Sequence, residues 1–515
     1  MRSAPPSHHA KLYRVACLAA LALLLVGLTM AYADLTNGGF ESGSFSGWVA
    51  DPNWVVVDNS CGYYSGWAGK YWAWSGGKGE AAMGKLTSLP FVLDKPAVHL
   101  LISGWGSIRG TGQPRHWNYV TLNLEDGTEI DRVWAPDTTA FVPAYLDGSK
   151  YRGRKVYIQA VDDADEPTFS MLCIDDVHTA DLPPEMTRPA PALPPFDPAK
   201  SVKLEDAAYL VEVSRANGSI TRVRDKTAGL DLILEPRLAG SFTFALPIPG
   251  REPWQTIEAN WIHGRDQRLS SCRLEGNRLT LRWDGPLRNY LGQEFAAAAT
   301  MTIELRDGGV LFSFHISNRS QYPVGEVYFP VLGGLQGLGK TWGQLKATQF
   351  LRPAGPTGRR RQPAAGQPPA EPLSCVAATI FQVFGNMAPF GDQGPEQFYA
   401  YPAAQPEPWV GFTAPKLGRS ALLGVRDPED RDLVVRLMLS PSSSGTPRDD
   451  GNWPRPEELG GLPVGVELSF VDTVGGPAGK DYSAAPVFLQ FLDGAGSEML
   501  KAFSAWGEAQ ADKAR

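Results

Sequence analysis

The chain has 515 residues, with 48 Lys and Arg against 55 Asp and Glu, and a formal net charge of −7. This acidic balance argues against a nucleic acid as the partner. Five cysteines in a chain of this length exclude a small disulfide-stabilised scaffold, and the length predicts two or three domains with substantial cores.

Residues 1–33 have the layout of a secretory signal peptide. Residues 1–14 are positively charged without an acidic residue, residues 15–30 form an apolar run, and Ala-Tyr-Ala ends at Ala33. An uncleaved anchor is the less favoured alternative, because the apolar run is short for a bilayer span. We expect export to the medium, the periplasm or the cell surface, with no membrane contact after cleavage.

Removal of this leader would leave 45 Lys and Arg against 55 Asp and Glu, so the mature chain would carry a net charge near −10. Cys61, Cys173, Cys272 and Cys375 would remain. Four cysteines allow three full pairings. A Cys61–Cys173 bridge is one possibility, and the sequence does not choose among them.

Residues 34–181 predict a first domain made of short strands. The segments 96–105, 116–134 and 154–163 alternate between apolar and polar residues or run apolar over strand lengths, and Asp126-Gly127 is a hairpin turn signal. Regularly spaced short strands favour a sandwich or jelly roll. Residues 182–200 contain seven prolines and predict an extended, semi-rigid linker.

Residues 201–496 predict a second and larger β domain. Their strands are too numerous for a simple sandwich and favour a large two-sheet supersandwich, so the chain as a whole is expected to be all-β. The Pro-, Gly- and Arg-rich segment 352–372 predicts a disordered loop. Residues 497–515 predict a short C-terminal amphipathic helix, with Met499, Phe503 and Trp506 at helical spacing.

Several motifs of the first domain resemble jelly-roll carbohydrate-binding modules. They are NGGFESGSFSGW (37–48), GEAAMGKLTSLPFVL (79–93) and CIDDV (173–177), together with segments 120–133 and 151–163. Over residues 36–180 the chain looks most like the module that accompanies levanase-type fructan hydrolases. In that family, a carboxylate of the first strand and an aspartate of the last strand share a structural calcium ion.

The resemblance implies that Glu41 and Asp175 hold this Ca²⁺, with Asp176 as a less favoured substitute for Asp175. Ca²⁺ takes several hard oxygen ligands, and loop carbonyls can complete a shell around two carboxylates. The alternative is that Glu41 and Asp175 accept backbone hydrogen bonds or face water.

Aromatic residues are a second signal in the first domain, which holds eight of the fifteen tryptophans. The loop 63–79 interleaves aromatic rings with glycines and polar residues, the side chains that a sugar ring with apolar faces and hydroxyl edges needs. We expect a carbohydrate, either a polysaccharide or a glycan, to contact Trp67, Tyr71, Trp72, Trp74, Trp105 and Trp117. The alternative is that these rings fill a core, as aromatic residues more often do.

The second domain resembles the galactose-mutarotase-like supersandwich, which precedes the catalytic barrel in several glycoside hydrolase groups. The segments 209–233, 312–335 and 482–494 carry this resemblance. The family uses a histidine acid and a glutamate base, for which the candidates here are His263, His315 and Glu326. None of the three lies in a recognisable catalytic motif, and a histidine on a strand is more often structural.

Other catalytic patterns are absent from the sequence, which has no HExxH, CxxC, GxSxG or P-loop. In larger relatives a barrel with paired carboxylates would follow the terminal helix, whereas this sequence ends at Arg515. We therefore expect an exported, non-catalytic carbohydrate-binding protein that assists polysaccharide or glycan breakdown, with a separate glycosidase as a possible partner. The alternatives are a glycoside hydrolase, epimerase or lyase with its site in the supersandwich cleft, and a structural surface protein.

Overall fold

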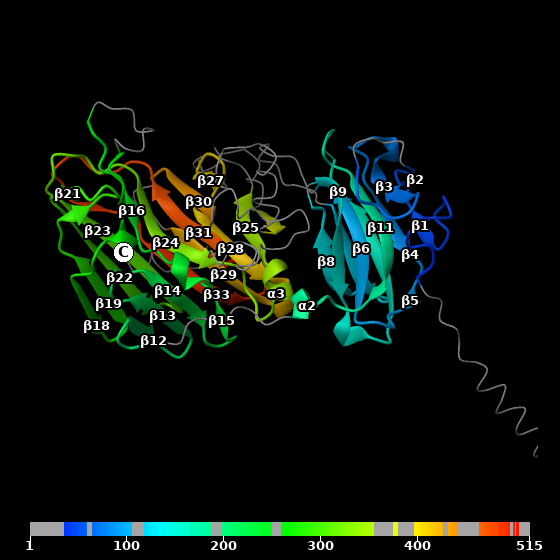
Figure 1. Ribbon diagram of the computed structural model, residues 1–515, viewed down its shortest axis with the longest axis horizontal. Coiled ribbons are helices and arrows are strands. Elements are labelled where there is room, and N and C mark those ends of the chain that lie inside the picture. Colours follow the sequence, from blue (N-terminus) through cyan, green and yellow to red (C-terminus); the bar gives the residue numbers. More distant parts are fainter. Residues whose placement is uncertain are drawn as a thin grey trace, which may run out of the picture.

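The computed structural model is nearly all β, as expected, with antiparallel sheets gathered in two sandwich-like domains and short helices (Figure 1). It describes residues 35–58, 64–105, 118–136, 138–165, 167–187, 197–249, 259–354, 374–379, 396–425, 431–440, 463–494, 498–499 and 501–503. The expected signal peptide at 1–33, Trp117 and Cys61 lie outside these ranges. Within them, no helix is long and apolar enough to cross a membrane.

The first domain is built from two antiparallel sheets. Its six-stranded sheet has the order β1 (Trp48–Ala50), β4 (Gly84–Ser88), β10 (Lys155–Asp162), β7 (Tyr119–Leu124), β8 (Glu129–Trp134), with β5 (Phe91–Val92) paired to β10. Its five-stranded sheet has the order β2 (Val55–Val57), β3 (Trp72–Trp74), β11 (Leu172–Ala180), β6 (Ala97–Gly104), β9 (Thr138–Asp147).

Alternation along these strands places the core between the two sheets. Leu122 and Ile158 point inward from the six-stranded sheet and meet Ile102 and Ile174 of the five-stranded sheet, all four at 1% exposure or less. Because successive side chains of a strand face opposite ways, the residues next to these must lie on the outer faces. Cys173 and Asp175, on either side of Ile174, are therefore on the outer face of the five-stranded sheet.

Two hairpins follow directly from their turn residues. Asp307 and Gly308 both have positive φ, 53° and 72°, the geometry of the two-residue turn that joins β22 (Ala297–Arg306) to β23 (Gly309–Asn318). Both strands alternate between buried and half-buried residues over their length. The turn predicted at Asp126-Gly127 also joins two paired strands, β7 and β8, although only Gly127 has a positive φ there.

The second domain has three main sheets. The four-stranded sheet has the order β12 (Ser201–Glu205), β13 (Tyr209–Ser214), β14 (Ile220–Asp225), β15 (Leu230–Asp231). The six-stranded sheet has the order β17 (Ile262–His263), β16 (Thr243–Phe244), β24 (Val327–Leu335), β31 (Gly465–Asp472), β30 (Leu433–Ser440), β27 (Glu396–Tyr401).

The ten-stranded sheet has the order β18 (Ser271–Glu275), β19 (Arg278–Trp283), β22, β23, β33 (Val487–Asp493), β29 (Arg419–Val425), β28 (Trp409–Ala414), β25 (Gln349–Ala354), β26 (Ser374–Thr379), with β32 (Tyr482–Ser483) paired to β23. A separate two-stranded ribbon consists of β20 (Leu287–Arg288) and β21 (Glu294–Phe295).

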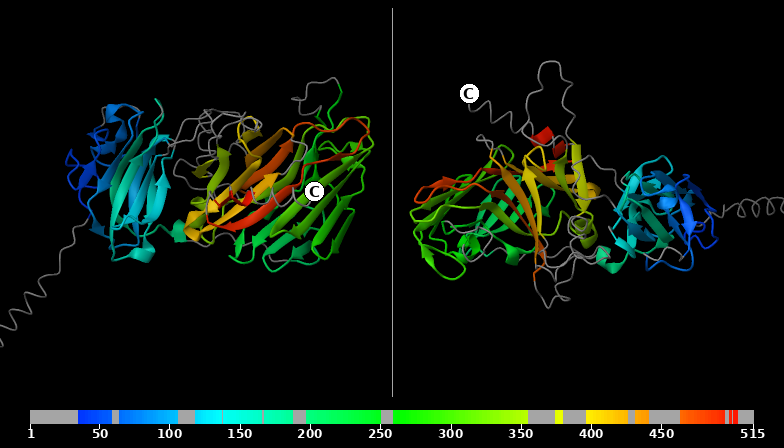
Figure 2. Two further views of the ribbon diagram at one scale, coloured as in Figure 1. Left: turned by 180° about the vertical axis from the view of Figure 1, so that it is seen from behind. Right: turned by 90° about the horizontal axis from the view of Figure 1, so that it is seen from above.

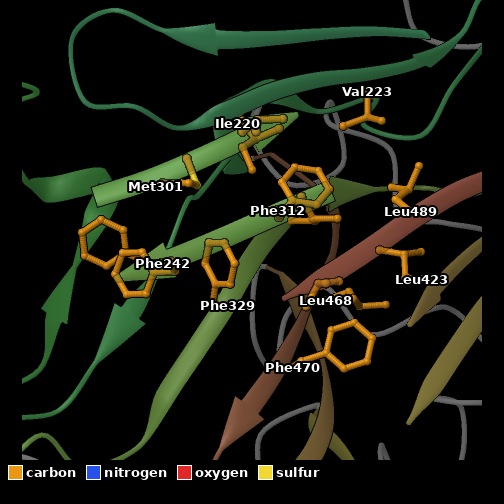
Figure 3. Packing of buried hydrophobic residues seen from close by; sticks show 14 of the residues in the cluster. Ile220, Val223, Phe242, Met301, Phe312, Phe329, Leu423, Leu468, Phe470 and Leu489 are labelled. Atoms are coloured by element: carbon orange, nitrogen blue, oxygen red, sulfur yellow. The ribbon is translucent and has the colours of Figure 1, made fainter. Parts of the chain in front are cut away.

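One continuous core joins these sheets (Figure 3). Phe312 of the ten-stranded sheet, Phe329 of the six-stranded sheet and Ile220 of the four-stranded sheet belong to the same cluster of buried apolar residues. The rings of Phe314 and Phe329 stack with centroids 5.0 Å apart. The large apolar area shared by three sheets makes this domain a single folding unit.

The described α-helices are short and lie in the linker, in the second domain and near the C-terminus. Within the predicted linker, α2 (Pro184–Thr187) lies against α3 (Trp342–Lys346) of the second domain. The two domains lie side by side, with α2 and α3 where they meet (Figures 1 and 2). Residues 352–354 of the predicted loop end strand β25, and the rest of that loop lies outside the described residues. Near the C-terminus, residues 501–503 are helical, and Met499 and Phe503 are buried against Trp409; Trp506 is not among the described residues.

Candidate functional site

The outer face of the five-stranded sheet carries several of the residues that the sequence singles out, among them Trp67, Trp72 and Trp74. A small apolar cluster lies there, separate from the sandwich core, and consists of Trp72, Phe141 and Cys173 with the half-buried Val57, Tyr64, Trp67, Trp74 and Leu101. Cys173 of β11 is paired with Trp74 of β3 and with Ser103 of β6, so three adjacent strands contribute to this face.

Trp72 is a correction to the predicted set of sugar contacts. Its side chain is only 1% exposed, and its ring packs on Tyr64, Phe141 and Trp67 at centroid distances of 4.7, 5.3 and 6.4 Å. Strand β3 lies between β2 and β11, and the preceding chain segment with Tyr64 and Trp67 covers its outer side. A ring enclosed in this way cannot stack on a sugar from solvent.

The other predicted rings that the structure describes, Trp67, Tyr71, Trp74 and Trp105, are half-buried. Trp67 and Trp74 border the cluster around Trp72. Tyr71 packs against the sandwich core instead, and the ammonium group of Lys70 lies 4.6 Å from its ring centroid. Trp67 and Trp74 therefore lie on the outer face of the sheet, whereas Tyr71 does not join the cluster there.

Trp105 has a neighbour that the sequence did not reveal. It directly follows β6, and its ring meets Phe169 edge-on with centroids 4.9 Å apart. Phe169 precedes β11, is 53% exposed and has a φ of +55°. A left-handed backbone is rare for a bulky residue and costs about 1–3 kcal/mol. The sequence carries no signal for this exposure, because phenylalanine is usually a core residue.

Glu41 and Asp175 converge on one segment of the chain. The Asp175 carboxylate accepts a hydrogen bond from the Ala68 amide (2.7 Å), and Glu41 accepts from the amides of Lys70 (2.9 Å) and Tyr71 (3.1 Å). A side-chain carbon added at Gly39 would lie 3.8 Å from Glu41 Cγ and 4.0 Å from Asp175 Oδ1. The Glu41 methylene chain and the Asp175 carboxylate thus both lie near Gly39.

The Asp175 carboxylate is not fully satisfied by these contacts. Its residue is 0% exposed, and Oδ1 has no hydrogen-bond partner within the part of the chain that the structure describes. Burial, together with the negative charges of Asp176 and Glu41, raises the pKa of Asp175 to about 7. A buried carboxylate oxygen of this kind needs a proton or a cation.

The second domain holds a polar cluster on one face of its six-stranded sheet. Tyr328 of β24 donates a hydrogen bond to Glu326 Oε2 (2.7 Å), and Trp261 packs edge-on against the Tyr328 ring. Thr243 of β16 is paired with Tyr328 on one side and with His263 on the other. His263 Nδ1 and the Thr243 hydroxyl are 3.1 Å apart.

Arg436 of β30 closes this cluster. Its guanidinium lies 5.2 Å from the Tyr328 ring centroid and pairs with Glu467 (2.8 Å) and with Glu396. Burial lowers the pKa of His263, and the Arg265 charge adds to this effect. Burial and the hydrogen bond to Glu326 raise the pKa of Tyr328. The cluster therefore combines a neutral imidazole, a carboxylate, a phenol and a guanidinium.

His315 does not belong to this cluster. It lies on β23 of the ten-stranded sheet, where Nδ1 is 2.9 Å from the Ser483 hydroxyl and Nε2 is 3.6 Å from Asp481 Oδ2. Of the three residues that the resemblance suggested for acid–base chemistry, His263 lies on the six-stranded sheet, Glu326 directly precedes its strand β24, and His315 lies on the ten-stranded sheet.

Comparison with known proteins gives similar structures only at low identity. No family model matches the sequence, and no curated protein matches it either. Similar solved structures include a galactose mutarotase related enzyme from Lactobacillus acidophilus (12% identity, 57% of this chain and 97% of that chain, TM-score 0.35). A galactose mutarotase-like protein from Clostridium acetobutylicum (10% identity, 57% and 95% coverage, TM-score 0.34) and a putative aldose 1-epimerase from Escherichia coli K12 (14% identity, 57% and 99% coverage, TM-score 0.28) are also similar to the chain.

Proposed function

We propose that the first domain binds the sugar rings of a polysaccharide or glycan through Trp67, Trp74, Trp105 and Phe169. Sugar rings have apolar C–H faces that pack on aromatic planes. Of these four rings, Phe169 is exposed and the three tryptophans are half-buried. The observation that carries the proposal is Phe169, which is 53% exposed in a left-handed backbone conformation beside the Trp105 ring. Strained, exposed residues cluster at ligand sites.

We further propose that Glu41 and Asp175 hold a structural Ca²⁺ ion. The donor set fits, because both carboxylates accept hydrogen bonds from the segment 68–71 and Asp175 Oδ1, near Gly39, is buried without a described partner. Ca²⁺ takes carboxylate and carbonyl oxygens. When bound, the ion would neutralise the two carboxylates and join the N-terminal segment to β11.

In this proposal the protein acts outside the cell, in the medium, the periplasm or the cell surface, as an accessory to polysaccharide or glycan breakdown. The leader pattern at 1–33 supports export by its sequence alone. A separate glycosidase would be the partner that cuts the bound polymer.

The carbohydrate proposal is tested with the mature chain on a glycan array, followed by calorimetric titration with the best glycan. Phe169→Ala should weaken binding about tenfold or more, since stacking on an aromatic ring contributes roughly 1–2 kcal/mol. Phe398→Ala is the matched control, because Phe398 is 55% exposed but lies on β27 of the second domain. Equal loss in both variants, or no loss in either, contradicts the proposal.

The calcium proposal is tested by thermal unfolding with and without a chelator. Ca²⁺ at a hundredfold excess over its Kd should stabilise the folded state by about 2.7 kcal/mol. Glu41→Gln should abolish the response to Ca²⁺ while leaving the circular dichroism spectrum unchanged. A chelator that leaves the parent protein's melting temperature unchanged would remove the basis for a shared ion.

A second candidate function is acid–base chemistry on a sugar at the six-stranded sheet of the second domain. The observation that favours it is the pair His263 and Glu326, which lie next to Thr243 and Tyr328 on adjacent strands with Arg436 nearby. General acid–base catalysis needs two such groups within reach of one substrate atom. Polarimetry of freshly dissolved aldoses, and hydrolysis of fluorogenic glycosides, should show turnover that Glu326→Gln and His263→Ala both abolish. Absence of turnover in the parent protein would rule out this catalytic candidate, and carbohydrate binding would then stand as the proposed function.

A further inference from the structure

Two histidines far apart in the sequence meet on the outer face of the five-stranded sheet. His99 of β6 and His178 of β11 are direct cross-strand partners, and their imidazole centroids are 4.7 Å apart. Asp176 lies between them. Its carboxylate oxygens are 3.6 Å from His99 Nδ1 and 3.3 Å from His178 Nδ1.

A β-bulge brings Asp176 to this position. The register of β6 against β11 shifts between Asp175 and His178, and Asp176 has a φ of +47°. The bulge also directs the Asp176 carbonyl toward both imidazoles, at 3.3 Å from His99 Nδ1 and 2.9 Å from His178 Nδ1. Bulges re-aim side chains and are over-represented beside functional sites. Here the bulge gathers oxygen atoms in front of two ring nitrogens.

The spacing of these atoms matches a first-row metal site. In tetrahedral Zn²⁺ sites the ligand atoms lie about 2.0–2.2 Å from the ion, so they are about 3.4 Å from one another. Here His99 Nδ1 is 3.6 Å from Asp176 Oδ2 and His178 Nδ1 is 3.3 Å from Asp176 Oδ1, and one ligand atom from each of the three residues lies within 4.8 Å of the others. Among the described residues, His99, Asp176 and His178 are the one such group of three.

We propose that His99, Asp176 and His178 bind a divalent first-row transition metal ion of the Zn²⁺ type. Two imidazoles and one carboxylate are ligands that suit Zn²⁺, Co²⁺ and Ni²⁺ and suit Ca²⁺ poorly. This site is therefore chemically distinct from the pair Glu41 and Asp175.

The surroundings of the three ligands favour a partly open site. The His99 side chain is 13% exposed and its ring rests edge-on against Tyr145 at 5.0 Å, whereas His178 and Asp176 are 52% and 41% exposed. Packing thus holds one ligand in place, while the other two face solvent. Three protein ligands leave a fourth position for water or for an oxygen of an external ligand.

The test uses the mature chain without a histidine tag, stripped of metal and titrated with CoCl₂ and then ZnCl₂. We expect one Co²⁺ per chain with the visible absorption of a four- or five-coordinate ion, displaced by Zn²⁺. His178→Ala and Asp176→Asn should each weaken Zn²⁺ binding about 100-fold or more, because even outer-shell losses cost 10–100-fold. Both substitutions affect exposed side chains, and asparagine tolerates the positive φ at position 176.

Two controls separate this site from others in the chain. His315→Ala removes a half-exposed imidazole of the second domain, and Glu41→Gln affects the calcium pair; both variants should bind Zn²⁺ like the parent. The circular dichroism and metal-free melting temperature of His178→Ala should also match the parent. The proposal is overturned if the parent binds neither ion, or if His178→Ala and Asp176→Asn bind Zn²⁺ as tightly as the parent.

Discussion

An ion pair between the two domains gives the sharpest stability prediction. Asp131 of β8 in the first domain and Lys416, in a short 3-10 turn at Pro415–Leu417 of the second, are 2.8 Å apart. The Asp131 side chain is 5% exposed and also accepts hydrogen bonds from the amides of Asp147 (2.7 Å) and Arg132 (2.9 Å). Burial raises the pKa of Asp131, and the Lys416 charge opposes this rise.

The magnitude follows from the geometry. At 2.8 Å and an effective dielectric constant of about 20, the Coulomb attraction is about 6 kcal/mol. Desolvation offsets much of it, and breaking a buried pair by removing one partner typically costs about 3–5 kcal/mol. When Lys416 is removed, two backbone amides still donate hydrogen bonds to Asp131, and Lys416 is itself 25% exposed, so the loss should fall at or below the low end of this range. We therefore expect Lys416→Ala to lower the free energy of unfolding by about 2–3 kcal/mol.

A double-mutant cycle measures the pair itself. The parent, Lys416→Ala, Asp131→Asn and the double variant are unfolded in urea and followed by tryptophan fluorescence and circular dichroism. The coupling free energy should be about 2 kcal/mol. Lys200→Ala is the control, because Lys200 is 84% exposed and lies 3.5 Å from Asp197 in a surface pair worth less than about 1 kcal/mol. A coupling below about 0.5 kcal/mol would refute the role given to Asp131 and Lys416.

Three further predictions concern single residues. Trp72→Ala should lower the free energy of unfolding by about 3–5 kcal/mol in urea denaturation, because it empties a position that is 1% exposed; a loss below about 1 kcal/mol would place the ring at the surface. Gly69→Ala should abolish the response of the melting temperature to Ca²⁺, because its Cβ would come within 2.3 Å of Glu41 Oε1. Gly153→Ala carries the same left-handed backbone cost with open space around it and should keep that response. Burial lowers the pKa of His263 in the folded protein, so as pH falls below about 6.5 His263 is protonated in the unfolded chain before it is protonated in the folded one. The second domain should lose stability over that window, and His263→Gln should flatten the pH dependence; an unchanged slope would contradict the burial of this imidazole.

Local patterns in the sequence determined the class of the fold. The alternation of β22 and β23 around Asp307-Gly308, and the apolar strand lengths of the first domain, predict antiparallel sheets because side-chain direction in a strand has a period of two. Glu41 and Asp175 were identified as carboxylates of interest by a family resemblance and not by the strand pattern. Whether they bind Ca²⁺ stays a prediction.

Only the tertiary structure decided which face each side chain occupies and which distant residues meet. Trp72 and Trp74 lie two residues apart on β3, yet Trp72 is enclosed by Tyr64 and Phe141 while Trp74 is half-buried. Phe169 is exposed, with a left-handed backbone, beside Trp105. The meeting of His99 and His178 depends on the pairing of β6 with β11 and on a bulge. Sequence patterns report the period of a strand, whereas the partner strand, the register and the covering loop are set by packing across the whole domain.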